Sequence, residues 1–444
     1  MPSFTRHKQL SSSQIILIGF AVVILIGSLL LMLPIASRDG HITSFPDTLF
    51  TATSAVCVTG LVVQDTGTYW SLFGQVIILA LIQTGGMGVI TLSIAFTTLS
   101  RKKIGLRQRS IMQDAISAPK VAGIVKLTRF IIKMTLFFEA AGALLMLPVF
   151  CREFGIRTGI WYSVFHSVSA FCNAGFDLMG IKGNFSSLSY FAGNPVINLV
   201  IMALIIIGGI GFLTWADFHQ YHFRFRKYSM QSKVILTTTF LLILFPAVYF
   251  FFGECNDLPL MQRILASFFQ SVTPRTAGFN TVDIANFHET GIAIIILLML
   301  TGGSPGSTAG GMKTTTLAVL FSTALQVFRR KEYTQFFQRR ISDKIVRSAI
   351  TLLMMYLLLS LSGGFIISRL EHLPLLTCLY ETASAIGTAG LSLGITPSLG
   401  TISHIILIIL MYIGRVGGLT LIFATATGCP NNTSKYPQEP LTVG

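Results

Sequence analysis

Charged residues are scarce in this chain: Asp, Glu, Lys and Arg make up only 11% of its 444 residues. Soluble domains carry about 25% charged residues. A chain with so few charges could not cover a surface that faces water, and 52% of its residues are hydrophobic, with a mean hydropathy of +0.71. The composition therefore predicts an integral membrane protein.

Cysteine is also rare, and the six cysteines are scattered singly, with no CxxC pair: Cys57, Cys151, Cys172, Cys255, Cys378 and Cys429. Neither a disulfide framework nor a metal site is expected from this pattern. The apolar segments contain no paired carboxylate, nucleophile–base pair or metal-ligand cluster. We therefore expect no enzyme activity and no covalent cofactor.

Acidic residues are the scarcer charged class, since 17 Asp and Glu stand against 32 Lys and Arg, for a net charge of +15. The basic residues concentrate between apolar segments, with nine in 101–133, four in 219–233 and seven in 329–347. This distribution is typical of cytoplasmic loops in membrane proteins. None of the three stretches lies on a recognisable nucleic-acid-binding module, so nucleic acid is not an expected partner.

Apolar segments long enough to cross a bilayer, which takes about 20 residues, recur along the chain. Eight are expected: 14–36, 70–98, 128–150, 195–216, 233–252, 288–328, 347–368 and 402–425. The first is too long for the apolar core of a cleaved signal peptide. Shorter amphipathic segments, suited to re-entrant half-helices, lie between alternate pairs: 47–56, 160–171, 260–273 and 374–386. The order is span, half-helix, span, four times over.

A related string follows each half-helix and ends in a glycine. The four strings end in Val58-Thr59-Gly60, Asn173-Ala174-Gly175, Thr276-Ala277-Gly278 and Thr388-Ala389-Gly390. Recurrence at this period predicts four repeats, 1–100, 101–218, 219–330 and 331–428, with a cytoplasmic tail at 429–444. Because the basic stretches join successive repeats, we expect both termini inside the cell and the half-helices to enter from outside.

A second string recurs in the span after the half-helix. Gly-Gly-x-Gly at 85–88 matches the same pattern at 208–211, and both resemble Gly-Arg-Val-Gly at 414–417. Two motifs in one order within successive repeats favour fourfold duplication. The fold class expected is all-α and integral to the membrane, with eight transmembrane helices in four helix–pore-helix–helix repeats of pseudo-fourfold symmetry around a central pore.

Irregular backbone at membrane depth is tolerated only where it is buried in protein or lines a water-filled cavity. Four such segments at equivalent positions predict a common axis, with carbonyl oxygens replacing the water shell of an ion. Each half-helix also directs its negative C-terminal end at the pore centre. We therefore expect a cation-selective filter that consists of the last three residues of each of the four strings, twelve residues in all. The alternative is that each glycine only ends a short helix.

Polar residues near these strings allow two interpretations each. Asp65, Asp177 and Asp283 follow their glycines by two to five residues; they either concentrate cations at the outer mouth or cap turns. The half-helices carry polar residues at similar positions, namely Thr51, His166, Gln270 and Glu381. These either form a hydrogen-bonded collar around the filter or are satisfied polar packing.

The sixth span is too long and is interrupted, because 301–311 contains five glycines and Pro305. We predict two helices, about 288–300 and 312–328, joined by a polar loop beneath the filter, where a gate would act. The gate residues expected are Gly302, Gly303, Ser304, Pro305, Gly306, Gly310, Gly311, Lys313 and Arg415. The alternative is that the interruption is only a kink needed for helix packing. The loop also resembles a nucleotide-binding P-loop, but the match fails by one residue and no strand precedes it, so we expect no nucleotide site here.

Three cations lie at predicted membrane depth, where charges are costly and usually face a cavity or a partner. Lys313 and Arg415 would place positive charge below the filter as a barrier to the ion. Arg415 could instead pin the loop through its carbonyls. Arg275 is interpreted as a buried structural charge bonded to carbonyls behind the third filter string.

The sequence resembles the membrane subunit of the Ktr potassium uptake systems, in the Trk/Ktr/HKT superfamily, from about residue 14 to the C-terminal region. The resemblance is carried by Val58–Leu61, Asn173–Phe176, Thr273–Phe279 and Gly414–Gly417. It implies uptake of potassium as the substrate, because Gly60 matches the position where serine accompanies sodium preference. It also implies that the gating loop of the family maps onto 301–311 and its pore arginine onto Arg415.

The same resemblance implies partners. It predicts a homodimer in the cell membrane, each subunit with its own pore, and a cytoplasmic ring of nucleotide-binding RCK subunits. Nucleotide would bind only to that ring, because this sequence has no dinucleotide-binding loop. Sodium as an activator is left open. The third string is one residue shorter than the others, which leaves its alignment before Arg275 uncertain.

Three other functions compete with a potassium pore. The first is a sodium or sodium-coupled transporter of the same fold. The second is a carrier for an organic solute, with a broken helix forming a site at mid-membrane; parallel repeats with half-helices argue against it. The third is a membrane enzyme, for which the sequence shows no catalytic constellation.

Overall fold

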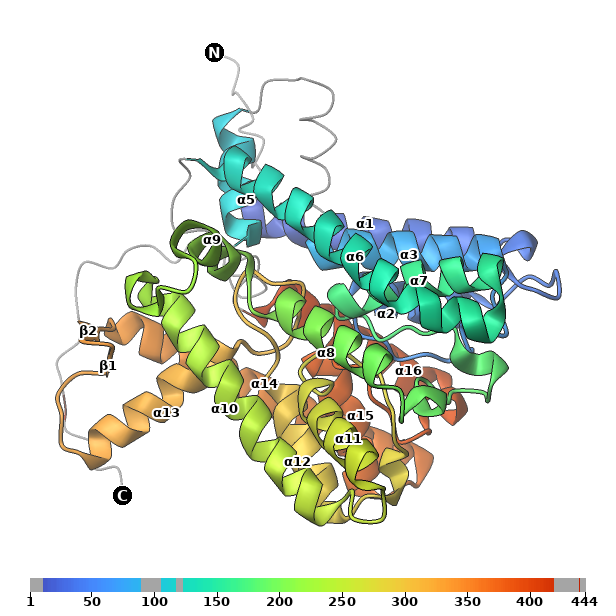
Figure 1. Ribbon diagram of the computed structural model, residues 1–444. Helices are drawn as coiled ribbons and strands as arrows, with labels where there is room; N and C mark the ends of the chain where they lie inside the picture. The colour runs from blue at the N-terminus through green and yellow to red at the C-terminus, as the bar shows by residue number, and fades with distance from the viewer. Residues whose placement is uncertain (1–10, 89–104, 117–122, 419–438, 440–444) are drawn as a thin grey trace.

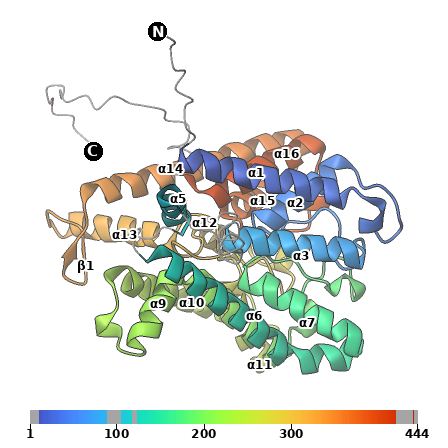
Figure 2. The ribbon, with the colours of Figure 1, turned by 90° about the horizontal axis from the view of Figure 1, so that it is seen from above.

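The computed structural model describes residues 11–88, 105–116, 123–418 and 439. This part of the chain is mostly helical, and the helices surround a centre where loops from distant parts of the sequence meet (Figures 1 and 2). Outside the described residues lie the predicted span ends at 89–98 and 419–425, the predicted tail at 429–444 apart from residue 439, and residues 1–10 of the predicted cytoplasmic N-terminus.

A series of long helix, short helix and apolar helix occurs four times along the chain. The series are α1 (Ser12–Leu31), α2 (Phe45–Val56) and α3 (Leu72–Met87); α6 (Ile124–Phe154), α7 (Ile156–Phe171) and α8 (Pro195–Gly209); α10 (Met230–Gly253), α11 (Leu260–Val272) and α12 (Glu289–Leu300); and α14 (Asp343–Glu371), α15 (Leu375–Gly387) and α16 (Thr401–Val416). Short helices thus occupy the four segments predicted as half-helices, namely α2, α7, α11 and α15.

The remaining elements lie between these helices, within a series or between two series. They are α5 (Leu106–Ile116), α9 (Phe212–Tyr221), α13 (Thr314–Phe328), the hairpin of β1 (Gln335–Phe336) and β2 (Arg339–Arg340), and six 3₁₀ turns, η1 (Pro34–Ala36), η2 (Met179–Ile181), η3 (Ser189–Phe191), η4 (Phe225–Lys227), η5 (Ile284–Asn286) and η6 (Thr396–Ser398). The helices α12 and α13 are the two halves predicted for the interrupted sixth span.

Local chemistry sets several helix ends. Ser11 and Gln14 form a capping box at the start of α1, and the Asn194 side chain accepts hydrogen bonds from the first turn of α8, which opens with Pro195. Gly88 and Gly417 end α3 and α16 with positive φ, 83° and 88°, which a glycine adopts without the penalty of a side chain. Helices predicted as continuous through these glycines therefore stop there.

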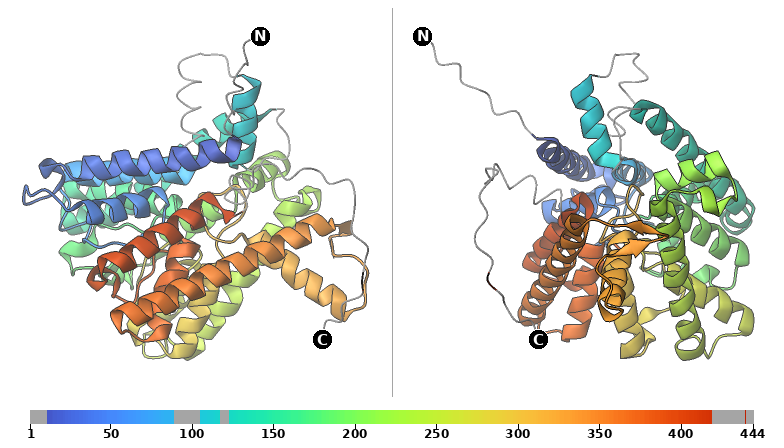
Figure 3. Two further views of the ribbon diagram at one scale, coloured as in Figure 1. Left: turned by 180° about the vertical axis from the view of Figure 1, so that it is seen from behind. Right: turned by 90° about the vertical axis from the view of Figure 1, so that its left-hand side faces the viewer.

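The four series contact one another in a closed cycle. The last helix of each series packs against the short helix of the next: α3 on α7, α8 on α11, and α12 on α15; the cycle closes with α16 on α2. Figure 3 shows the first and last series, in blue and red, side by side although they come from opposite ends of the chain. The short helices are consequently the most enclosed elements, with Phe50, Phe165 and Phe269 fully buried.

Among the described residues, four helices are long and apolar enough to cross a membrane, namely α1, α6, α10 and α14, or five if α8 and α9 count as one span. The α8–α9 pair is bent by 97°, so the single span predicted at 195–216 is corrected to a broken one at Gly209–Gly211. Shorter apolar helices are α3, α12, α13 and α16. The long helices expose large apolar side chains such as Leu25, Phe137 and Phe245, which only a lipid environment accommodates in such number.

Candidate functional site

Four glycines from the four series meet at the centre of the molecule and are called here the glycine ring: Gly60, Gly175, Gly278 and Gly390. A methyl group on Gly60 would lie 2.5 Å from the Ala174 carbonyl oxygen, and one on Gly175 would lie 2.7 Å from that of Ala277. The next two contacts complete the ring, because Gly278 faces the carbonyl of Ala389 and Gly390 faces that of Thr59. The ring has no room for side chains, and a backbone carbonyl stands at each of its four junctions.

The backbone two residues before each glycine is left-handed in every loop. The φ angles are 55° at Val58, 58° at Asn173, 73° at Thr276 and 50° at Thr388. Such angles cost non-glycine residues of order 1–3 kcal/mol each, and three of these four side chains are β-branched. Strain repeated at four equivalent positions indicates that the course of the backbone, rather than the side chain, is what each loop requires.

A hydroxyl side chain near the end of three of the four short helices anchors the loop that follows. Ser54 accepts a hydrogen bond from the Gly60 amide at 3.1 Å, Ser169 donates to the Phe176 carbonyl at 2.7 Å, and Thr273 donates to the Phe279 carbonyl at 2.6 Å. The fourth loop differs, because the Ser384 hydroxyl has no partner among the described residues, and it is the Ser384 backbone carbonyl that accepts from the Ala389 amide at 2.8 Å. Sequence reasoning did not single out these hydroxyls, although a Ser or Thr stands at this place in all four strings.

The shorter third string has a specific effect on the backbone. The Thr59, Ala174 and Ala389 amides each donate to a carbonyl five residues earlier, at 2.8 Å, whereas the Ala277 amide donates to Thr273, four residues earlier, at 2.9 Å. The missing residue is therefore absorbed in the turn between Thr273 and Ala277. Gly278 still reaches the ring.

Three of the four polar residues in the short helices form a collar, since each bonds the segment after its own ring glycine. The His166 ring accepts from the Leu178 amide at 3.3 Å, and Gln270 donates to the Asn280 side chain at 2.8 Å. Glu381 accepts from the Ser392 hydroxyl at 2.6 Å, the Leu393 amide at 3.1 Å and the Thr396 hydroxyl at 2.8 Å. Thr51 differs, because its hydroxyl donates to the Asp47 carbonyl of its own helix at 2.9 Å.

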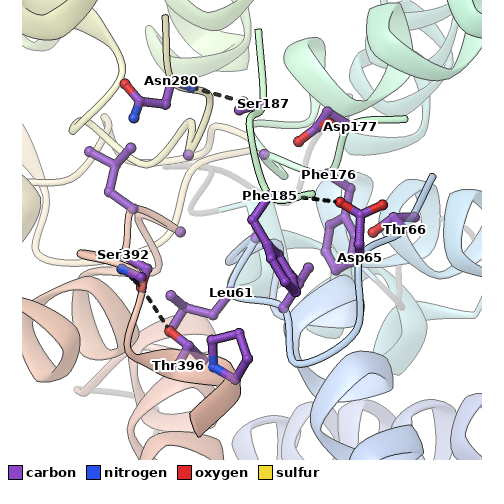
Figure 4. Close-up of a pocket in the computed structure, with 18 residues that line it drawn as sticks. Leu61, Asp65, Thr66, Phe176, Asp177, Phe185, Ser187, Asn280, Ser392 and Thr396 are labelled. Atoms are coloured by element: carbon purple, nitrogen blue, oxygen red, sulfur yellow. Dashed lines mark hydrogen bonds between the residues drawn. The ribbon is translucent and has the colours of Figure 1, made fainter. Parts of the chain in front are cut away.

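A cavity of about 150 Å³ opens directly above the glycine ring and is called here the vestibule. All four loops line it, and the four ring glycines form its floor; the other lining residues include Leu61, Asp65, Phe176, Asp177, Phe185, Ser187, Asn280, Leu391, Ser392 and Thr396 (Figure 4). Backbone and hydroxyl oxygens, with two carboxylates, supply its polar lining.

The three aspartates of the outer segments all accept hydrogen bonds from nearby turns. Asp65 binds the amides of Gly67 and Thr68 with one oxygen and the Phe185 amide, 120 residues away, with the other at 2.9 Å. Asp177 accepts from the Met179 amide at 2.8 Å, and Asp283 caps η5 through the Ala285 amide at 3.1 Å. Asp65 and Asp177 also line the vestibule, whereas Asp283 does not. Their geometry is that of turn caps, two of which line the vestibule.

The loop between α12 and α13 lies against the other side of the ring. Thr308 donates to the Phe171 carbonyl at 3.0 Å and accepts from the Asn173 side chain at 3.2 Å. Gly310 packs against the Thr388 hydroxyl, and a methyl group on Gly311 would lie 2.7 Å from the Gly387 carbonyl oxygen. The loop is thus in contact with two of the four strings, on the face opposite the vestibule.

The recurring Gly-rich strings of α8 and α16 hold this loop. The Ser304 and Thr308 amides donate to the carbonyls of Gly209 at 2.9 Å and Gly208 at 3.3 Å, and the Gly311 amide donates to that of Gly414 at 3.3 Å. Within the loop, Thr301 and Met312 form an isolated bridge that draws its two ends together. The predicted gate residues Gly302 and Gly303 lie in the closed neck, and Pro305 and Gly306 in the turn beside Gly211.

Arg415 clamps the loop to α3. Its guanidinium donates to the carbonyl of Thr308, to that of Gly85 and, at 3.2 Å, to that of Gly86. These bonds match the second role considered for Arg415 from the sequence, in which it holds the loop by binding its backbone carbonyls.

The other two intramembrane cations are held differently. The Lys313 amine donates to the Ala309 and Gly310 carbonyls at 2.8 and 3.2 Å, so it stabilises its own loop. The buried Arg275 donates to the Thr239 hydroxyl of α10 at 3.4 Å. Among the described residues Arg275 has no bond to the backbone carbonyls expected for it, because its side chain turns away from the ring towards α10.

Comparisons with known proteins identify the family of the chain. The family model described as "TrkH: Cation transport protein" matches residues 5–435. The chain is 40% identical to the potassium/sodium uptake protein NtpJ of Enterococcus hirae, over 99% of this chain and 98% of the relative. It is 38% identical to the Ktr system potassium uptake protein B of Bacillus subtilis, over 97% of this chain and 96% of the relative.

A solved structure has the same fold. The potassium transporter TrkH from Vibrio parahaemolyticus superimposes with a TM-score of 0.74 at 20% identity, over 95% of this chain and 86% of that one. The match is to a transporter, as are the curated relatives, so the expectation that the chain is no enzyme is confirmed. The chain is a multi-pass membrane protein and belongs to the TrkH family of cation transport proteins.

Proposed function

We propose that this chain carries potassium ions into the cell through a pore whose selectivity filter is the glycine ring. The observation that carries the proposal is the closed ring itself, with the carbonyls of Thr59, Ala174, Ala277 and Ala389 at its junctions. Carbonyl oxygens can replace the hydration shell of a potassium ion. The buried hydroxyls of Thr59, Thr276 and Thr388, which have no partner within the described part of the chain, are further oxygen ligands beside that path.

The architecture that goes with this function is eight spans in four repeats, related by pseudo-fourfold symmetry around the pore. The cyclic contacts of the four series and the equivalent strain in the four loops support it. The basic stretches at 101–133, 219–233 and 329–347 then face the cytoplasm of a cell membrane, together with both termini. The vestibule is the outer mouth.

Potassium is the proposed substrate because Gly60 has no side chain, so that only backbone atoms stand at the first position of the glycine ring. Two relatives are named as potassium uptake proteins, which supports the same ion. A sodium or sodium-coupled transporter is the second candidate, since the relative from Enterococcus hirae is named a potassium/sodium uptake protein. A role for sodium as an activator belongs to the same candidate.

The loop at 301–311 is the proposed gate, with Lys313 and Arg415 as its fixed cations. Its contacts with Asn173 and Thr388, on the face of the ring opposite the vestibule, support this role, and its glycines let the backbone repack. Deleting part of 301–311 should raise potassium flux without a regulator. Unchanged flux in a folded deletion variant would remove the loop from the gate.

The proposed assembly is a homodimer in which each subunit has its own pore, regulated by a separate cytoplasmic ring of nucleotide-binding RCK subunits. The names of three relatives as parts of a Ktr system support a multi-component assembly. Mass measurement of the detergent-solubilised protein, alone and with a candidate RCK protein, tests both parts. A chain that is monomeric and does not bind the RCK protein would contradict both parts.

The experiment for the transport activity is flux in liposomes that contain the purified chain. Potassium flux down a potassium gradient is compared with sodium flux down an equal sodium gradient. Potassium flux well above sodium flux supports the proposal. Equal or sodium-dominated flux favours the sodium transporter, and no flux of either ion contradicts both.

A further inference from the structure

A basic and aromatic surface at the start of α10 takes no part in the proposed ion path. It is called here the corner and consists of residues 218–233, which include η4, together with residues 329–341, which include the β1–β2 hairpin. The two segments hold four and five basic residues and a single acidic one. Aromatic side chains stand out from it, with Phe223 89% exposed, Phe225 41% and Phe337 48%.

The corner is built from two segments that pack together. The rings of Phe225 and Phe337 lie 6.4 Å apart, and the Lys233 amine sits 5.8 Å from the Phe337 ring while it donates to the Arg226 carbonyl at 2.8 Å. Arg340 stacks on Tyr333 at 3.6 Å. Figures 1 and 2 show the hairpin standing beside the turn that leads into α10. Charged groups are therefore held in place on an aromatic base.

The tip of the hairpin presents an aromatic ring at a conformational cost. Phe337 and Gln338 both have positive φ, 45° and 64°, which is the pattern of a tight two-residue hairpin turn. Asn and Gly usually occupy such turns, and a bulky residue there is strained. Strain of this kind is retained where the exposed group has a use.

The corner lies at the depth of lipid headgroups. The helix α10 has 24 residues, or about 36 Å at about 1.5 Å per residue, which is enough to cross a hydrocarbon core of about 30 Å. Lys233 is in its first turn, Phe240 lies about two turns further on and Phe245 more than three, and both side chains are exposed, 62% and 68%. A basic surface thus continues directly into an apolar one.

We propose that the corner binds an anionic phospholipid, with the phosphate on Arg226, Lys227 and Arg340, the aromatic rings at the interface, and the acyl chains along the outer face of α10. Lys and Arg near the membrane surface attract anionic headgroups, and aromatic side chains favour the same depth. A free phosphate ion would leave the exposed rings and the apolar face unused. An acidic soluble protein would not reach the exposed side chains of α10 within the bilayer.

The test is native mass spectrometry of the full chain, titrated with phosphatidylglycerol or with phosphatidylcholine of the same acyl chains. We expect tighter binding of phosphatidylglycerol by about tenfold, and loss of most of that preference in the variant Arg226→Gln/Lys227→Gln/Arg340→Gln. Phe337→Ser should weaken lipid binding with no change in net charge. Inorganic phosphate at millimolar concentration should displace none of the lipid.

The matched control is Lys126→Gln/Arg129→Gln/Lys133→Gln, which removes the same charge from exposed positions on α6. This control variant should keep the preference for phosphatidylglycerol over phosphatidylcholine. Equal binding by the corner variant and the unmodified chain, equal loss in the control, or displacement by phosphate would overturn the proposal. A corner variant that keeps lipid but loses a cytoplasmic regulator would make the corner a protein-docking surface instead.

The inference rests on the proposed orientation in the bilayer, but the number of bound lipids seen by native mass spectrometry does not depend on ion flux. A chain that transports potassium without preference for phosphatidylglycerol refutes the corner alone. All substituted side chains are exposed or half-exposed, and melting in phosphatidylcholine should be unchanged. If the triple variant does not fold, Phe337→Ser decides the question by itself.

Discussion

Arg415 donates a hydrogen bond to the backbone carbonyl of Thr308, 107 residues earlier in the chain, and so fastens the loop beneath the glycine ring to α16. The same guanidinium binds the carbonyls at the end of α3. Thr308 in turn contacts Phe171 and Asn173 of the second string. One side chain thus connects the first, second, third and fourth series at the inner end of the proposed pore.

Removing this clamp should release the loop. We expect Arg415→Gln to raise potassium flux without a regulator by about tenfold, because charge-assisted bonds of about 1.5–3 kcal/mol would be lost from the closed state. Flux in liposomes is the measurement. Arg263→Gln is the control, since Arg263 binds the Phe251 carbonyl at the outer end of α10. Flux unchanged in Arg415→Gln, or raised equally in both variants, would contradict the clamp.

The collar predicts unequal effects at two equivalent positions. Glu381→Ala leaves the donors of Ser392, Leu393 and Thr396 without their acceptor and should destabilise the protein by about 3 kcal/mol. Thr51→Ala removes one bond within a helix and should cost less than about 1 kcal/mol. Thermal unfolding in detergent compares the two. Similar melting temperatures for both variants would show that the collar bonds contribute little.

Close packing behind the strings gives a prediction about stability alone. A methyl group on Gly208 would collide with the Phe171 carbonyl, and Gly85 and Gly414 face the carbonyls of Val56 and Ile386 in the same way. Gly208→Ala should therefore lower the melting temperature strongly, by an overpacking cost of about 1–3 kcal/mol. Gly253→Ala, where the nearest atom is 3.4 Å away at the end of the Tyr249 side chain, should not. A Gly208→Ala protein that folds with an unchanged melting temperature would indicate that α8 can move away from α7.

The short helices could be located from the sequence because each has a length unsuited to a crossing and is followed by a glycine string. The breaks at Gly88, Gly211 and Gly417 were missed, although the strings that contain them were recognised. Apolar residues continue through these glycines, so hydropathy gives no sign of a positive φ or of the 97° bend between α8 and α9.

The ring glycines could be identified by recurrence, but their partners could not. Arg415 and Gly85 are 330 residues apart, and only the closed cycle of helices brings them together. The preference of Arg275 for Thr239 over nearby carbonyls depends in the same way on how α10 packs. By contrast, the Ser or Thr whose hydroxyl anchors three of the four loops recurs in all four aligned strings and would have been found by comparing every position of the repeat.

The glycine ring makes the sharpest claim about selectivity, because its size is set by backbone contacts. At Gly60 a side chain would meet the Ala174 carbonyl at 2.5 Å and would have to adopt φ 97°. Gly60→Ser should therefore widen or distort the ring and weaken discrimination between potassium and sodium. Gly40→Ser is the matched control, because Gly40 also has a positive φ, 71°, but nothing within 4 Å.

The most direct measurement is the ratio of potassium to sodium flux in liposomes for the unmodified chain, Gly60→Ser and Gly40→Ser, each under equal single-ion gradients. The account predicts a high ratio for the unmodified chain and Gly40→Ser, and a ratio lower by about tenfold, or about 1.4 kcal/mol, for Gly60→Ser. A Gly60→Ser protein that folds, transports and keeps the full ratio would contradict the glycine ring as the selectivity filter.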